Sequence, residues 1–183
     1  MLLANEPHTG CFVRPHGSVA LHERSAVTIS CYEPMAVPAL LQTEVYGRTA
    51  GTTARQAVLH GDRAPESVFY LREEALRRQV GCPSTMRDQL MALVFLSCRP
   101  HVTIRLVPSP GRHQELDHGS TVLTYGKGAG PLVYTSTDLV TVFVDDEQAV
   151  RAHQAKHAVL ARLAWDEDRS REAFARLADA LDR

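Results

Sequence analysis

The sequence lacks the features that mark membrane proteins and disulfide-bonded secreted proteins. It contains only four cysteines among 183 residues, and none of them shows the C-x-x-C spacing of a zinc or redox site. No apolar run approaches the roughly 20 residues that span a bilayer. The opening segment M-L-L-A is too short for the core of a signal peptide. We therefore expect a cytoplasmic protein with reduced thiols and no membrane association.

The chain also lacks an excess of either charge. Its 20 Lys and Arg residues stand against 21 Asp and Glu residues, which gives a formal net charge of −1. Nucleic-acid binding rests largely on basic side chains that neutralise phosphates. We therefore predict that the protein does not bind DNA directly.

The composition is that of a soluble globular protein, with 44% hydrophobic and 22% charged residues. A chain of this length can bury a sizeable core in one domain. Residues 1–25 contain scattered proline, glycine and histidine, and they predict an irregular N-terminal lead. Residues 26–183 predict a single α+β domain that binds a ligand or a partner. The lead has no room for the two helices of a helix-turn-helix unit.

Segments that are typical of strands alternate with helical patterns in the first half of the chain. Residues 27–32 and 102–107 are rich in β-branched side chains, and residues 67–71 form a short buried-strand pattern. A long helical connection between two strands predicts parallel pairing with a right-handed crossover. The second half predicts short strands and two closing helices, at 121–125, 132–135, 139–143, 145–164 and 169–181. We predict an α+β fold: a mixed β-sheet of four to five strands with a parallel βαβ unit, flanked by helices.

Several segments carry a family resemblance. Residues 32–48 read Y-E-P-M-A-V-P-A-L-L-Q-T-E-V-Y-G-R, and further matching segments lie at 73–81, 89–90 and 100–108. Together they resemble the WhiJ-like, antitoxin-like helix-turn-helix regulators of actinobacteria, over roughly residues 26–180. The resemblance implies a domain of unknown function in developmental or antibiotic regulation, often beside a small companion protein. Such regulators usually carry a DNA-binding domain in front, and we expect that domain to be lost here.

The predicted strand order places a ligand cavity at one edge of the sheet. Parallel strands bind ligands in the crevice beyond their carboxyl ends. We expect this cavity between a helix at 38–46, the ends of the strands at 67–71 and 102–107, and the loop at 108–119. Its apolar walls are expected from Leu41, Tyr46 and Leu106.

The polar residues that we expect to contact a ligand come from the same region and from the segments that carry the resemblance. His113 lies in the polar loop, and a histidine titrates near neutrality and can act as a hydrogen-bonding ligand or as an acid or base. Glu73 follows a predicted strand, and Gln42 and Thr43 flank the apolar stripe of the predicted helix. The ligand-binding candidates are Gln42, Thr43, Tyr46, Glu73, Arg77, Gln89, His113 and Tyr134.

Two functions from different classes fit these residues. The first is a stand-alone regulatory sensor domain that binds a small metabolite or a small companion protein. The second is an enzyme of secondary metabolism, built on the same pocket, in which acidic and basic side chains transfer protons. Its catalytic candidates are His113, Glu73, Tyr134 and Cys31. The oligomeric state is left open, and a homo-oligomer is compatible with either function.

Two other patterns resemble ligand sites at first sight. His153 and His157 have the i, i+4 spacing of zinc-binding helices, but no third ligand follows them in the sequence. The glycines at 126, 128 and 130 stand between two predicted strands, whereas a phosphate-binding loop opens a helix. We therefore predict no bound metal and no cofactor.

Overall fold

The computed structural model describes residues 10–14, 18–50, 55–108, 116–137 and 139–181. These residues form one seven-stranded sheet in the order β1-β7-β6-β5-β2-β3-β4. The strands are β1 (Cys11–Arg14), β2 (Thr28–Glu33), β3 (Glu66–Arg72), β4 (Val102–Val107), β5 (Ser120–Thr124), β6 (Leu132–Ser136) and β7 (Thr141–Val144). The α-helices and 3-10 helices (η) are α1 (Val19–Ser25), η2 (Ala39–Leu41), α2 (Glu44–Thr49), η3 (Gln56–Leu59), α3 (Glu73–Arg77), α4 (Pro83–Leu96), α5 (Glu147–Leu163) and α6 (Glu167–Ala180). None of these described helices has the length and apolar character needed to cross a membrane.

Strands β2, β3 and β4 run parallel, and the other neighbouring strands are antiparallel. Helical segments connect the parallel strands, η2-α2-η3 between β2 and β3 and α3-α4 between β3 and β4. The structure is therefore an α+β fold that contains a parallel βαβ unit. The predicted number of four to five strands is wrong, because seven strands join one sheet.

Six of the seven strands overlap segments that the sequence predicts as strands, so the undercount comes from strand pairing, which local pattern does not show, and from β1. Strand β1 lies in the segment that the sequence predicts to be irregular, and its register pairs Cys11 with Val144. A four-residue strand is too short for alternation to be recognised. Helix α1 lies in the same segment and buries Val19 and Glu23. Residues 1–25 thus contribute two elements to the domain rather than an irregular lead alone.

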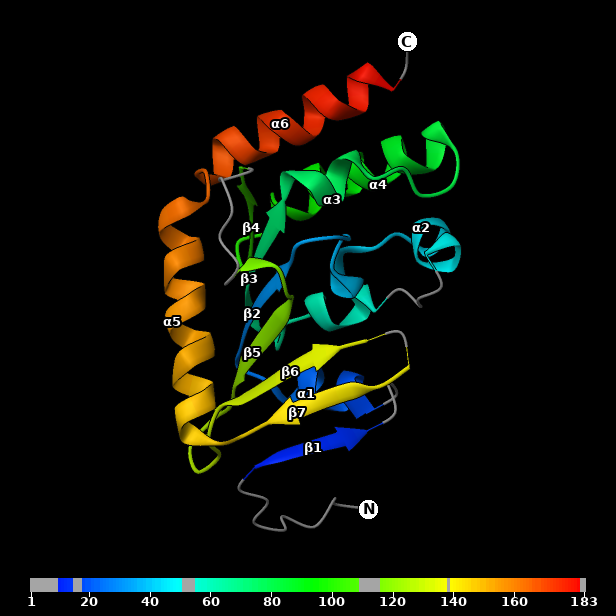
Figure 1. Ribbon diagram of the computed structural model, residues 1–183. Coiled ribbons are helices and arrows are strands. Elements are labelled where there is room, and N and C mark those ends of the chain that lie inside the picture. The colour runs from blue at the N-terminus through cyan, green and yellow to red at the C-terminus, as the bar shows by residue number, and fades with distance from the viewer. Residues whose placement is uncertain (1–9, 15–17, 51–54, 109–115, 138, 182–183) are drawn as a thin grey trace.

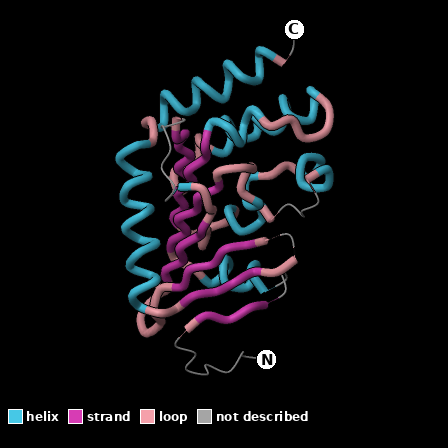
Figure 2. The backbone as a smooth tube through the Cα atoms, in the orientation of Figure 1, coloured by secondary structure: helices cyan, strands magenta, loops and turns pink. Residues whose placement is uncertain are grey.

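Helices cover the two faces of the sheet unequally (Figure 1). One face carries the row Cys31, Phe69 and Ile104, and packs its large hydrophobic core against α1, α4 and the segment from η2 to η3. We call it the broad face. The other face packs against α5 through a smaller cluster that includes Tyr32 and Leu160, and we call it the α5 face. Figure 2 shows the strands as a layer between α5 and most of the other helices.

The junction between α5 and α6 closes the outer edge of β4. The backbone N–H of Trp165 donates to the Leu106 carbonyl at 2.9 Å, and the Leu106 N–H donates to Oγ of Ser170 at 2.9 Å. The guanidinium of Arg105 donates to the carbonyls of Ala164 and Trp165. Backbone groups that an edge strand would leave unpaired are thereby satisfied.

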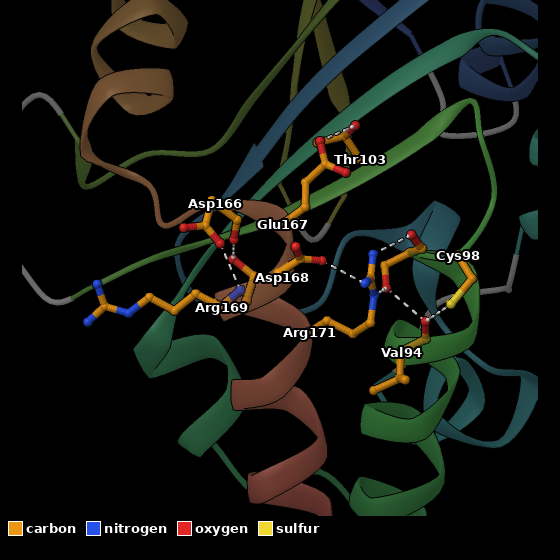
Figure 3. Close-up of polar contacts among 10 residues, drawn as sticks. Val94, Cys98, Thr103, Asp166, Glu167, Asp168, Arg169 and Arg171 are labelled. Atoms are coloured by element: carbon orange, nitrogen blue, oxygen red, sulfur yellow. Dashed lines mark hydrogen bonds and ion pairs between the residues drawn. The ribbon is translucent and has the colours of Figure 1, made fainter.

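Side-chain contacts fix the N-terminal end of α6 (Figure 3). Asp166 caps the helix by accepting a hydrogen bond from the Arg169 N–H at 2.8 Å. Arg171 donates to the Ser97 hydroxyl at 3.0 Å and to the Asp168 carboxylate at 2.9 Å, which ties α6 to the end of α4. Helix α6 therefore begins beside the end of β4 and packs on α4 (Figure 1).

Candidate functional site

The carboxyl ends of the three parallel strands lie together at one edge of the sheet, which we call the carboxyl edge. Strand β2 ends at Glu33, β3 at Arg72 and β4 at Val107. The register pairs Glu33 with Leu71, and Leu71 with Leu106, so the three ends are level. Parallel sheets bind their ligands beyond this edge.

A pocket of about 170 Å³ opens at the carboxyl edge, and we call it the α6 pocket. Its size is close to that of a roughly 150 Å³ engineered cavity that accepts benzene. Its walls are mostly apolar. The lining residues are Glu73, Leu106, Trp165, Ala173, Arg176 and Leu177. The pocket can therefore hold one ring or one branched aliphatic group.

Trp165, the single tryptophan of the chain, is held in place beside this pocket. Its backbone N–H is fixed to Leu106, as described above. The guanidinium carbon of Arg169 lies 4.0 Å from the centroid of the indole ring, which is a cation–π contact. The aromatic wall of the pocket is thus positioned before a ligand arrives.

The two charged residues of the α6 pocket differ in their partners. Glu73 opens α3 and forms an ion pair with Arg77 at 2.5 Å. Arg77 itself is exposed and does not line the pocket. Arg176 is exposed on α6, and no other described residue forms an ion pair or hydrogen bond with its guanidinium. A guanidinium in this position can receive an anion.

Gln89, which the resemblance places among the ligand-binding candidates, acts as a clamp inside the protein. Its side chain is fully buried. The amide nitrogen donates to the Leu41 carbonyl at 2.8 Å, and the amide oxygen accepts from the Thr43 N–H at 2.8 Å. Both contacts hold the turn between η2 and α2 against α4.

The predicted helix at 38–46 consists of two separate elements, η2 and α2. Thr43 has an extended backbone and caps α2, because its hydroxyl accepts a hydrogen bond from the Tyr46 N–H at 3.3 Å. Gln42 is buried and donates to the Val37 carbonyl at 2.8 Å. Tyr46 is also buried. None of these residues lines the α6 pocket.

Tyr134 and Cys31 lie within the core on the broad face. The Tyr134 hydroxyl donates to Oε1 of the buried Glu23 at 2.6 Å, and Arg55 lies 3.3 Å from the other oxygen of that carboxylate. Burial raises the pKa of the Cys31 thiol and of the Tyr134 hydroxyl. Neither side chain lines the α6 pocket or ionises near neutral pH. Glu23 is not recognisable from the sequence as a core residue, because it lies in the segment predicted to be irregular.

The remaining candidates are histidines. His113 lies outside the described residues. His157 is buried on the α5 face, where Nδ1 hydrogen-bonds the Ser30 hydroxyl at 2.7 Å and Nε2 hydrogen-bonds the Ser120 hydroxyl at 3.1 Å. Burial lowers the pKa of His157 to about 4, and it also lowers the pKa of His153. Within the described ranges, no group of three His, Cys, Asp or Glu residues could hold a metal ion.

Glu33 is a further polar residue at the carboxyl edge, and sequence analysis does not single it out. The side chain is partly buried. Burial raises the pKa of its carboxyl to about 7, and the nearby Lys156 opposes this effect. No other described residue forms a hydrogen bond or an ion pair with it. Its position directly after the predicted strand at 27–32 and directly before Pro34 is the signal that could have identified it.

Comparison with known proteins identifies a family. A family model described as "Domain of unknown function (DUF5753)" matches residues 47–176, which is more than half of the chain. No curated protein matches the chain. Among solved structures, the chain is similar to TrmBL2, an archaeal chromatin protein whose structure shows a novel mode of DNA binding. That match has 10% sequence identity and a TM-score of 0.49, and it covers 86% of this chain and 51% of the other. The chain thus spans about half the length of that protein.

One sequence-based prediction, the absence of direct DNA binding, needs correction. The prediction of no direct DNA binding rests on a net charge near zero. Net charge averages over the whole surface, whereas phosphate binding depends on local clusters of basic side chains. The prediction that excludes direct DNA binding is therefore wrong as a conclusion from net charge.

Proposed function

The chain belongs to the family described as a domain of unknown function (DUF5753), and we propose that it acts as a regulatory sensor domain that binds a small molecule in the α6 pocket. The observation that carries this proposal is the pocket itself. It lies at the carboxyl edge, where parallel sheets bind ligands, and it has apolar walls with few polar groups. The resemblance to WhiJ-like regulators supports the regulatory role.

The lining of the α6 pocket favours an apolar acid as the ligand. Leu106 and Trp165 supply apolar contact area for a ring or a branched alkyl group. Arg176 supplies a planar guanidinium, which can bind a carboxylate through two parallel hydrogen bonds. The carboxylate of Glu73 is already paired with Arg77. The expected ligand is therefore a small aromatic or branched aliphatic carboxylate.

The alternative, an enzyme that uses the same pocket, has less support. Cys31 and Tyr134 are enclosed in the core, and burial raises the pKa of both side chains. A nucleophile or base must reach its substrate and ionise near the working pH. Glu73 is at the pocket but is engaged by Arg77. These placements support a binding function over catalysis.

Fluorescence of Trp165 tests the proposal directly, because the chain contains no other tryptophan. The intact protein is titrated with phenylacetate and 3-methylbutanoate, and in parallel with the corresponding neutral amides. We expect a saturable change in emission with the acids. The amides should bind about tenfold more weakly, because a hydrogen bond to a charged group contributes about 1.5–3 kcal/mol.

Four variants locate the binding event. Ala173→Leu fills the pocket and should abolish binding while keeping Trp165, whereas Ala155→Leu makes the same change at an exposed position of α5. Arg176→Ala should weaken the acids but not the amides, and Arg162→Ala is its exposed control. Unchanged acid binding by the Ala173→Leu variant would place the ligand elsewhere and overturn the proposal.

A further inference from the structure

Glu33 occupies the carboxyl end of a central strand without a hydrogen-bond or ion-pair partner among the described residues. Strand β2 lies between β3 and β5 in the sheet, and Glu33 is its last residue. Its side chain is partly buried, and it makes no hydrogen bond or ion pair with any other described residue. Partly buried carboxylates are costly unless donors surround them. Lys156 attracts the Glu33 carboxylate from a distance, but no described residue donates a hydrogen bond to it.

The backbone of Gly119 forms one wall of the Glu33 site. A Cβ atom on Gly119 would lie 2.8 Å from Oε2 and 3.0 Å from Cδ of Glu33. The pairing of Tyr32 with Ser120, one residue before Glu33 and one after Gly119, holds the two segments together. Only glycine leaves room for the carboxylate in its observed position. The pairing of β2 with β5 thus places Gly119 beside the Glu33 carboxylate.

Two cations near the Glu33 site are already engaged. Lys156 donates to the His118 carbonyl and lies 5.3 Å from the centroid of the Tyr32 ring. Arg72 forms ion pairs with Glu74 at 3.3 Å and with Asp117 at 3.6 Å. The titratable and charged groups around this end of β2 are Lys156 from α5, Arg72 and Glu74 from the β3–α3 junction, and Asp117 and His118 from the segment before β5. The carboxylates therefore outnumber the cations here. They are Glu33, Glu74 and Asp117, and the two cations, Arg72 and Lys156, already have other contacts.

We propose that Glu33 anchors a second ligand site, separate from the α6 pocket, that binds a primary ammonium or guanidinium group. A cation offers the carboxylate both Coulomb attraction and charge-assisted hydrogen bonds. An anion would be repelled, and an apolar group would bury the charge further. The inference does not depend on the sensor function, because it rests on different residues and a different ligand charge.

The two sites are close but distinct. The register places Glu33, Leu71 and Leu106 in one row across three strands, so Glu33 and the Leu106 wall of the pocket are about 10 Å apart. Leu71 lies between them and is fully buried. A variant that fills the α6 pocket should therefore leave the Glu33 site intact.

Cation binding at Glu33 is linked to proton release. Burial raises the pKa of the Glu33 carboxyl to about 7, and only the ionised carboxylate attracts a cation. A cation must therefore displace a proton below neutral pH. For a group with a pKa of about 7, the apparent dissociation constant should rise about tenfold between pH 8 and pH 6.

Carbon-13 NMR of the glutamate carboxyl groups in the full chain tests this site. Ethylammonium and ethylguanidinium chloride are the probes, and ethanol is the neutral control. We expect both cations, but not ethanol, to lower the apparent pKa of the Glu33 signal, which Glu33→Gln identifies by removing it. Glu33→Gln should abolish cation binding, whereas Glu66→Gln, at the exposed start of β3, should retain it.

Two further variants keep the result interpretable. Gly119→Ala should displace the carboxylate and weaken cation binding although Glu33 is present. Ala173→Leu should bind both cations as the unmodified protein does. If neither cation changes the apparent pKa of the Glu33 carboxyl, water alone solvates this group, and the proposal is overturned. Loss of cation binding in Ala173→Leu would overturn the claim of a separate site.

Discussion

His157 packs against strand β2 and Glu33 is the last residue of that strand, but the two side chains differ in their partners. His157 is 6% exposed, and both of its ring nitrogens bond to serine hydroxyls. Glu33 is partly buried and has no hydrogen-bond or ion-pair partner among the described residues. Buried polar groups in native proteins nearly always have partners. The fold itself supplies the hydrogen-bond partners of His157. It supplies none for Glu33, and we therefore expect a ligand to bind there.

The same contrast separates the core of the domain from its carboxyl edge. Gln89 and Tyr134 each make specific hydrogen bonds deep in the protein. Arg176, at the α6 pocket, has no such partner among the residues that the structure describes. We therefore assign the first group to stability and the edge residues to binding, and the following predictions test this division in order of expected effect.

Gln89→Ala should cause the largest loss of stability. The substitution leaves the Leu41 carbonyl and the Thr43 N–H without their partners and creates a cavity. We expect a loss of about 3 kcal/mol in the free energy of unfolding, measured by urea denaturation. Gln154→Ala, at an exposed helical position, should change it by less than about 0.5 kcal/mol. A Gln89→Ala protein that keeps its stability but loses ligand binding would show that Gln89 belongs with the residues that bind the ligand.

His157 should make stability depend on pH below neutrality. Its folded-state pKa of about 4 lies below the ordinary histidine value of 6.5, so the unfolded chain binds the proton more readily. Its contribution is fully present above pH 6.5 and is lost as the pH falls toward 4. The loss should reach about 3 kcal/mol relative to pH 7. His157→Gln should flatten this part of the profile in denaturation measured between pH 4 and 8, and an unchanged slope would contradict the assignment.

Much of the fold is predictable from the sequence because its signals are local. The β-branched segments that become β2 and β4 are recognisable from their own residues, and the long connections between strands indicate parallel pairing. The pairing of Cys11 with Val144 in β1 is not readable in this way. It depends on a contact across most of the chain, and a strand of four residues has little pattern of its own.

The candidate site is predictable only in part, for a related reason. Strand order alone places Glu73 and Leu106 at the carboxyl edge, and both line the α6 pocket. Trp165 and Arg176 come from the α5–α6 region, whose docking on β4 depends on contacts such as that between Leu106 and Ser170. Gln89 belongs to a segment that resembles a family hallmark. Such a residue can hydrogen-bond the protein's own backbone, as Gln89 does, and need not contact a ligand.

Tyr134→Phe should have a moderate effect, because it removes one hydrogen bond from a buried carboxylate. Glu23 would keep its ion pair with Arg55 but lose the hydroxyl at 2.6 Å. We expect a loss of about 2 kcal/mol in the free energy of unfolding. In a Glu23→Gln background the same substitution should cost less, and this double-mutant cycle measures the coupling. Equal costs in both backgrounds would show that the hydroxyl acts independently of Glu23.

Glu33→Gln should have the smallest effect and the opposite sign. Its folded-state pKa, about 7, lies above the ordinary glutamate value of 4.5, so ionisation opposes folding. The contribution of Glu33 to stability is therefore fully present below pH 4.5 and is lost as the pH rises through 7. Without a ligand, Glu33→Gln should be about 1 kcal/mol more stable than the unmodified protein at pH 8 and equal to it at pH 4, an estimate reduced for partial exposure.

A saturating cationic ligand should reverse the difference at pH 8, because only the unmodified protein gains binding energy. Denaturation at both pH values, with and without ethylguanidinium, measures all four cases. Destabilisation of the ligand-free Glu33→Gln protein at pH 8 would place Glu33 with His157, among the residues whose partners the fold itself supplies.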